Sequence, residues 1–259
     1  GKEPDVMAEA ARIIEELQPD IIDINFGCPV RKVAGKGAGA GLLQDIPKMI
    51  KIAESVVNAV SVPVTVKTRL GWDDSSKPIV DIAKRLQGVG VQALTIHGRT
   101  RAQMYTGEAD WTLIGEVKNT PGIIIPIIGN GDVDSPHKAK HMFDEYGVDA
   151  VMVGRASIGC PWIFREIKHF LQTGTELPPM TLAEQVLEFK EYMDKSVEVK
   201  GLPQGVIHMR RQFAKGFKGL QNFRDTRIQL LTRTDYDETI ALLDEIVAKW
   251  GDLSIGNRQ

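Results

Sequence analysis

Short apolar segments rich in β-branched residues alternate with amphipathic segments along the first part of the chain. Five of these apolar segments predict strands, at residues 20–26, 62–68, 91–97, 123–129 and 149–153. Each gap between them is long enough for a helix, as a right-handed βαβ crossover requires. The pattern therefore predicts a parallel sheet in an α/β fold.

The segments between the strands carry apolar residues at helical spacing. Residues 47–60 and 77–86 each repeat an apolar position every three or four residues, which is typical of an amphipathic helix. A further helical pattern covers residues 8–17, and no strand pattern precedes it.

Polar or reactive residues stand at the carboxyl end of every predicted strand. In a (β/α)8 TIM-type barrel these ends form the active-site face, whereas structural polar residues would be scattered over both ends. Five strands cannot close an eight-stranded barrel, so we expect a barrel portion of about five βα units, either as an open barrel or as a fragment.

The pattern changes after Phe170, where Gly174 and the pair Pro178-Pro179 interrupt the chain. Thr181 with Glu184 forms a capping box that begins a helix over residues 182–197. Further helices are predicted at residues 204–218, 224–231 and 235–249. We therefore expect a barrel portion over residues 1–172 and a small α-helical domain over residues 173–259.

Composition is that of an ordinary soluble globular protein, with 42% hydrophobic and 25% charged residues and a net charge of -2. Residues 200–233 depart from this average, because eight basic residues and one acidic residue, Asp225, give them a charge of +7. Either these residues form a solvated basic face, or they contact a phosphate backbone; segregation this strong favours the second.

The two cysteines, Cys28 and Cys160, are too few for a disulfide framework, so a reducing cytoplasm is the expected location. The sequence has no apolar run near the ~20 residues that span a bilayer and no signal-peptide pattern at its start. We expect a soluble, cytoplasmic protein without a membrane partner.

Cys28 lies just past the first strand in a tight turn, where it can face a ligand, although an inert buried cysteine is the commoner case. Cys160 has no acid–base partner at a strand end, so a structural role is favoured. Lys67 ends the second strand, and a cation there needs an anionic or polar ligand or a neighbouring acid.

His97, Arg99 and Arg101 follow the third strand and supply groups suited to a ring carbonyl and to phosphates. The last two strands lead into two glycine-containing turns, a position where barrels hold a phosphate on backbone N–H groups. These turns contain Asn130, Gly131, Asp132, Gly154 and Arg155.

Other chemistries find less support. The glycine-rich residues 35–41 lack the Gly-Lys-Ser/Thr ending of a phosphate loop, so a flexible loop is the favoured interpretation. No cluster of His and Cys has metal-ligand spacing, and no Gly-x-Ser-x-Gly turn is present, which leaves zinc chemistry and serine hydrolysis unsupported.

Taken together, five motifs closely resemble those of the tRNA-dihydrouridine synthases in order and spacing, with the bacterial B-type branch most similar. The motifs are DINFGCPV (23–30), VTVKTR (64–69), HGRTR (97–101), GNGD (129–132) and MVGR (152–155). The resemblance extends into the C-terminal helices at HMRR (208–211) and KG (215–216).

The resemblance implies an FMN-containing (β/α)8 barrel followed by a helical tRNA-binding domain. NADPH would reduce FMN, the flavin would pass hydride to C6 of a tRNA uridine, and Cys28 would protonate C5. By the same resemblance Lys67 and His97 contact the flavin, and Asn130, Gly131, Asp132, Gly154 and Arg155 hold its ribityl and phosphate groups. Contacts with the uridine or flavin are implied for Asn25, Arg99, Arg101 and Tyr105, and contacts with the tRNA backbone for Arg210, Arg211 and Lys215.

One feature departs from the family pattern, because the family's first three strands, with a glutamine against the flavin, have no counterpart here. An open edge of this kind would expose hydrophobic surface. Two alternatives therefore stay open: another FMN barrel oxidoreductase acting on a small molecule, and a catalytically silent fragment that binds tRNA.

Overall fold

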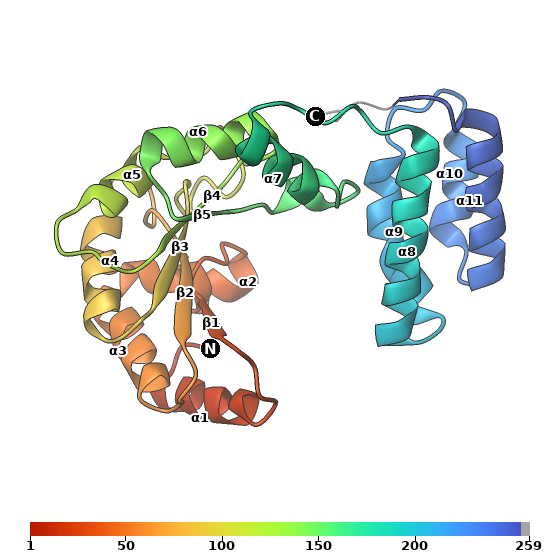
Figure 1. Cartoon of the computed structure of the whole chain (residues 1–259). Helices are drawn as coiled ribbons and strands as arrows, with labels where there is room; N and C mark the ends of the chain where they lie inside the picture. The colour runs from red at the N-terminus through yellow and green to blue at the C-terminus, as the bar shows by residue number, and fades with distance from the viewer. Residues whose placement is uncertain (255–259) are drawn as a thin grey trace. The chain divides into compact units, whose positions relative to one another are not determined.

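The structure is a computed structural model that describes residues 1–254. Five strands form one parallel sheet whose spatial order follows the chain order (Figure 1). They are β1 (Ile22–Asn25), β2 (Val64–Arg69), β3 (Ala93–His97), β4 (Ile127–Asn130) and β5 (Ala150–Met152). All five predicted strands are present, and their unbroken parallel order is that of successive strands in a (β/α)8 barrel.

Helices connect the strands, and those from α3 to α6 line the outer side of the curved sheet (Figure 1). They are α1 (Pro4–Glu15), α2 (Arg31–Ala34), η1 (Gly39–Gln44), α3 (Ile46–Val57), α4 (Ile79–Gly88), α5 (Thr112–Asn119) and α6 (Pro136–Tyr146). The apolar periodicity explains their packing, because α4 buries Ile79, Ile82, Ala83 and Leu86 on one face.

The sheet edge at β1 is open within the described chain, where β1 pairs with β2 alone. Near this edge Leu17 and Ile21 are 82% and 54% exposed, as the sequence led us to expect of an unpaired edge.

The glycine-rich residues 35–41 form a loop only in their first part: residues 35–37 are an exposed turn, whereas residues 39–41 are helical and packed. Gly39 begins the 3-10 helix η1, and residues 39–43 are all buried. A Cβ at Gly41 would lie 2.4 Å from the Ala34 carbonyl oxygen, so only glycine allows the helix this close to α2. The glycines therefore serve close backbone packing.

The chain divides into two compact units. The first contains residues 1–133 and 138–154, and the second contains residues 134–137 and the chain from residue 155 onward. The functional boundary expected at residues 172/173 stays a prediction.

Up to residue 254, the second unit contains the 3-10 helix η2 (Arg155–Ser157) and five α-helices. They are α7 (Ile163–Thr173), α8 (Leu182–Lys200), α9 (Gln204–Gly216), α10 (Arg224–Thr232) and α11 (Tyr236–Trp250). The predicted capping box is present, because the Thr181 hydroxyl accepts from the Glu184 N–H while the Glu184 carboxylate accepts from the Thr181 N–H. Helices α8 to α11 enclose a core built around Phe189, Phe213 and Phe217.

Residues 1–254 contain no helix long and apolar enough to cross a membrane. Over the same residues, no group of three or more His, Cys, Asp or Glu side chains could hold a metal ion.

Candidate active site

The carboxyl ends of the strands bring predicted site residues into one row across the sheet. Arg69 on β2 pairs in register with His97 on β3, and His97 pairs with Asn130 on β4. Residues in register on parallel strands point to the same side, so these three side chains are neighbours. We call Lys67, Arg69, His97, Arg99 and Asp132 the strand-end cluster.

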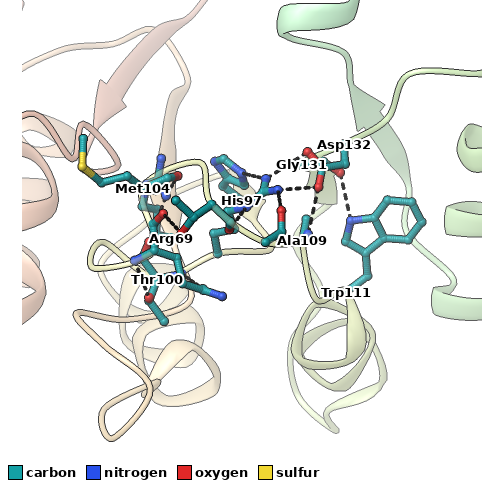
Figure 2. A network of polar contacts seen from close by, with 12 residues as sticks. Arg69, His97, Thr100, Met104, Ala109, Trp111, Gly131 and Asp132 are labelled. Atoms are coloured by element: carbon teal, nitrogen blue, oxygen red, sulfur yellow. Dashed lines mark hydrogen bonds and ion pairs between the residues drawn. The ribbon is translucent and has the colours of Figure 1, made fainter. Parts of the chain in front are cut away.

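Arg69 is a fully buried cation that joins two loops (Figure 2). Its Nε donates to the Gly27 carbonyl at 2.9 Å, and its Nη1 donates to the carbonyls of Thr100 and Met104 at 2.9 and 2.8 Å. Its guanidinium carbon also lies 5.5 Å from the centre of the Tyr105 ring. Arg69 thus fixes the loop that carries Cys28 against the loop that follows β3.

Cys28 sits in a turn whose shape depends on its neighbours. The Asn25 Oδ1 accepts a hydrogen bond from the Gly27 N–H at 2.9 Å, and the Cys28 carbonyl accepts from the Ala40 N–H at 3.1 Å. Gly39 has φ +54°, and a Cβ there would lie 3.1 Å from the Cys28 Cβ. Cys28 is a free, partly exposed thiol, while Asn25 shapes its loop.

Lys67 is a cation without a local partner: its ammonium makes no hydrogen bond or ion pair with residues 1–254. Burial, followed by the charge of Arg69, lowers the pKa of Lys67 to about 8, and Asp23 opposes this only in part. A ligand with an electron-rich edge would relieve that cost.

Arg99 and Asp132 form an ion pair beneath the turn that follows β4. The Arg99 Nη1 and Nη2 donate to the two carboxylate oxygens at 2.9 and 2.6 Å, and the Arg99 side chain is 2% exposed. Its remaining N–H groups are directed at His97 and at the carbonyls of Thr106 and Gly107. This geometry argues against the predicted contact of Arg99 with tRNA and assigns it to loop anchoring, because no N–H remains for a ligand.

Two glycine-containing turns follow β4 and β5. The Asn130 Nδ2 donates to the Met152 carbonyl at 2.7 Å, which ties β4 to β5. Gly131 has φ +109°, and its carbonyl accepts from the Trp111 Nε1 (Figure 2). A Cβ at Gly154 would meet no atom within 4 Å, so open space adjoins this glycine.

The remaining predicted residues of the first unit are Arg101 and Tyr105. The Arg101 guanidinium lies 4.5 Å from the centre of the Trp72 ring, so it stacks on an aromatic side chain. Tyr105 is 50% exposed, and its ring centre lies 6.3 Å from that of His97. Tyr105 therefore lies beside the strand-end cluster, and its contact with a ligand stays a prediction.

In the second unit, the adjacent residues Arg210 and Arg211 have different surroundings. Arg211 and Lys215 are exposed one helical turn apart on α9, with His208 on the same face. These three residues are called the α9 basic face. Arg210 instead donates from Nη2 to the carbonyls of Thr232 and Arg233 at 2.8 and 3.1 Å, which stabilises the end of α10. The tRNA contact that the resemblance implied for Arg210 stays a prediction.

Two other residues of this unit were singled out by the sequence. Cys160 is partly buried, and this burial raises the pKa of its thiol to about 12, in keeping with the favoured structural role. Arg155 is the first residue of η2, and its expected role in a phosphate site stays a prediction.

Comparison with known proteins assigns the family. The model of the dihydrouridine synthase (Dus) family matches residues 1–249. The chain belongs to the dihydrouridine synthase family.

Individual relatives support the B-type branch of dihydrouridine synthases. The tRNA-dihydrouridine synthase B of Pseudomonas aeruginosa is 42% identical over 96% of this chain and 74% of that protein. The proteins of the same name from Salmonella typhimurium and Yersinia pestis are 54% and 52% identical over 71% of this chain. In each of these two comparisons the match spans 57% of the relative's length.

The motif VTVKTR contains a strand-end residue, Arg69, to which the sequence analysis assigned no role. Arg69 lies two positions after Lys67 on β2, and alternation along a strand places both on one side of the sheet. That spacing is the signal that could have identified it.

Proposed function

We propose that this chain carries the active-site residues of a B-type tRNA-dihydrouridine synthase, which reduces uridines in tRNA to 5,6-dihydrouridine with FMN as cofactor and NADPH as reductant. One observation supports the proposal most directly. Arg69 holds the loop that carries Cys28, and it does so beside the hydrogen-bond donors of the strand-end cluster. A cytoplasmic location goes with this proposal.

The strand-end cluster fits the electron-rich ring and the phosphate of FMN. It contains three cations and one carboxylate, and that carboxylate is already paired with Arg99. The Lys67 ammonium has no hydrogen-bond or ion-pair partner among residues 1–254, and open space adjoins Gly154. An anionic or carbonyl-bearing ligand would compensate the desolvated charge.

When bound, FMN would supply the hydride that adds to C6 of the uridine. Lys67 and His97 would orient the flavin through its ring carbonyls, and Asn130, Gly131 and Gly154 would lie against its ribityl and phosphate groups. Asp132 would act here through Arg99. Cys28 would donate its thiol proton to C5, and Asn25 with Arg69 would keep that thiol in place.

The α9 basic face would hold the tRNA backbone. Arg211 and Lys215 are exposed and spaced for phosphate contacts along one helix face, and such contacts fix position without reading sequence. Tyr105 and Arg101 would contact the uridine after it leaves the base stack.

The two cysteines allow a matched test of this mechanism. Replacing Cys28 by Ala removes the proposed proton donor, so dihydrouridine formation in purified tRNA should fall by a factor of about 100 or more, while tRNA affinity stays unchanged. Cys160→Ala is the control and should keep full activity. Undiminished activity of Cys28→Ala would rule out Cys28 as the proton donor.

Flavin content tests the cofactor separately. The purified chain should absorb in the visible range and release FMN on denaturation. A colourless, folded chain that still binds tRNA would instead favour the tRNA-binding alternative.

A further inference from the structure

The contact between Arg99 and His97 determines which imidazole nitrogen carries the proton. The Arg99 Nη1 lies 3.4 Å from the His97 Nε2. A guanidinium can only donate, so Nε2 must accept and the His97 proton must be on Nδ1. An Nε2–H would place two donors against each other.

The Arg99 side chain has little freedom to move away from this contact. All five of its N–H groups have acceptors: His97, the two oxygens of Asp132, and the carbonyls of Thr106 and Gly107. Asp132 is held in turn, because one carboxylate oxygen also accepts from the Ala109 N–H at 2.9 Å (Figure 2). The ion pair therefore presents a fixed donor to Nε2.

Gly131 adds a steric constraint on the same edge of the ring. A Cβ at Gly131 would lie 2.7 Å from the His97 Cδ2 and 3.1 Å from its Nε2, so the backbone covers this edge closely. The Nδ1, in contrast, makes no hydrogen bond with residues 1–254 and is not among their sealed, unpartnered polar atoms. It remains available to a ligand.

Burial and the positive charges around His97 keep the ring neutral. Burial first, then the charges of Arg69, Lys67 and Arg99, lowers the pKa of His97 to about 3, and Asp132 opposes this effect. At neutral pH the ring therefore carries one proton, which the contact with Arg99 assigns to Nδ1.

We propose that Arg99 and Asp132 are positioning residues that hold His97 as the neutral Nδ1–H tautomer. His97 then offers one hydrogen-bond donor to a carbonyl or other electron-rich atom of a ligand, and it is not a proton source. The use of this donor toward a flavin or uracil carbonyl rests on the proposed function, whereas the tautomer itself does not.

Long-range proton–nitrogen correlation spectra of the 15N-labelled protein test the proposal without a ligand. The His97 signals are identified by their loss in His97→Gln. They should show the Nδ1–H pattern and keep it from pH 8 down to pH 5. An Nε2–H pattern or a doubly protonated ring at pH 7 would overturn the proposal.

Variants distinguish a role in positioning His97 from a role in protein stability alone. Arg99→Met should shift the His97 signals toward a mixture containing the Nε2–H tautomer, and Asp132→Asn, which keeps the shape of the side chain, should shift them in the same direction. Lys118→Met is the matched control, because it breaks the Lys118–Asp149 ion pair of the same unit away from His97. It should leave the tautomer unchanged. Unchanged His97 signals in both Arg99→Met and Asp132→Asn would contradict the positioning role.

Flavin binding supplies a second, separate readout. Losing the oriented donor should weaken FMN affinity of Arg99→Met about tenfold, the effect of about one hydrogen bond. If His97 shows the Nδ1–H tautomer but the wild-type chain binds no flavin, the proposed function fails while the positioning role stands.

Discussion

The strand-end cluster and the α9 basic face are both rich in cations, but they hold them in opposite environments. Arg69 and Arg99 are each 2% exposed and donate to carbonyl groups and to one carboxylate. Arg211 and Lys215 lie in solvent on one side of a helix. A buried cation fixes loops or requires a ligand, whereas an exposed one attracts a polyanion over a distance.

Arg210 and Arg211 show the same difference between adjacent residues. One helical position separates an arginine that stabilises the end of α10 from one that faces water. The number of basic residues in a segment therefore overestimates the charge available to a nucleic acid.

The largest expected effect comes from the buried region. Arg69→Met would leave the carbonyls of Gly27, Thr100 and Met104 without their donor, at about 1–3 kcal/mol for each acceptor that remains unsatisfied. We expect a loss of about 3–5 kcal/mol in the free energy of unfolding. Urea denaturation of the purified chain measures this loss.

Arg85→Met is the control for Arg69→Met. It breaks an exposed ion pair with Asp81 and should change stability by no more than about 0.5 kcal/mol. A similar small loss for Arg69→Met would mean that the two loops do not depend on its guanidinium.

The exposed region should respond in binding and not in stability. The double replacement of Arg211 and Lys215 by Ala removes about two phosphate contacts, so tRNA affinity should fall about tenfold and depend less steeply on salt. Filter binding at several salt concentrations gives both quantities.

Arg210→Ala is the matched control in the same helix. It should cost about 1 kcal/mol of stability through the lost contact with the end of α10 and change tRNA affinity little. If Arg210→Ala weakened tRNA binding as much as the double variant while the unit stayed folded, the separation between the two arginines would be wrong.

The fold was predictable because its signals are local. Apolar runs and helical periodicity identified all five strands and the helices α3, α4 and α8 to α11, and strand ends identified where His97 and Lys67 lie. The local sequence pattern did not predict which of the cationic side chains face a ligand. Arg99 points into the protein because its guanidinium donates hydrogen bonds to the carbonyls of Thr106 and Gly107. These contacts depend on the tertiary path of the loop.

The prediction of a flexible loop over residues 35–41 was wrong for residues 39–41 for a related reason. Their composition is typical of a flexible loop, but Gly39 begins a helix with a positive φ of +54°, and Gly41 lies so close to the Ala34 carbonyl that no Cβ fits. Close approach of two backbones leaves no signal in a single sequence, since the partner lies elsewhere in the chain.

The smallest expected effect tests how the strand-end cluster meets its ligand. Lys67 has a pKa of about 8 in the folded protein, below its ordinary value of 10.5, so the unfolded chain binds more protons between these values. Stability of the free protein should therefore rise as the pH increases from about 8 to about 10.5. The affinity for a ligand should change with pH in the opposite direction.

An electron-rich ligand prefers the protonated ammonium, so FMN affinity should fall by up to tenfold between pH 7 and pH 9. Flavin fluorescence titrations at several pH values measure this fall. The Lys67→Arg side chain stays charged over the whole range, so the FMN affinity of this variant should not change with pH. An equal slope in this variant would show that another group controls the pH dependence.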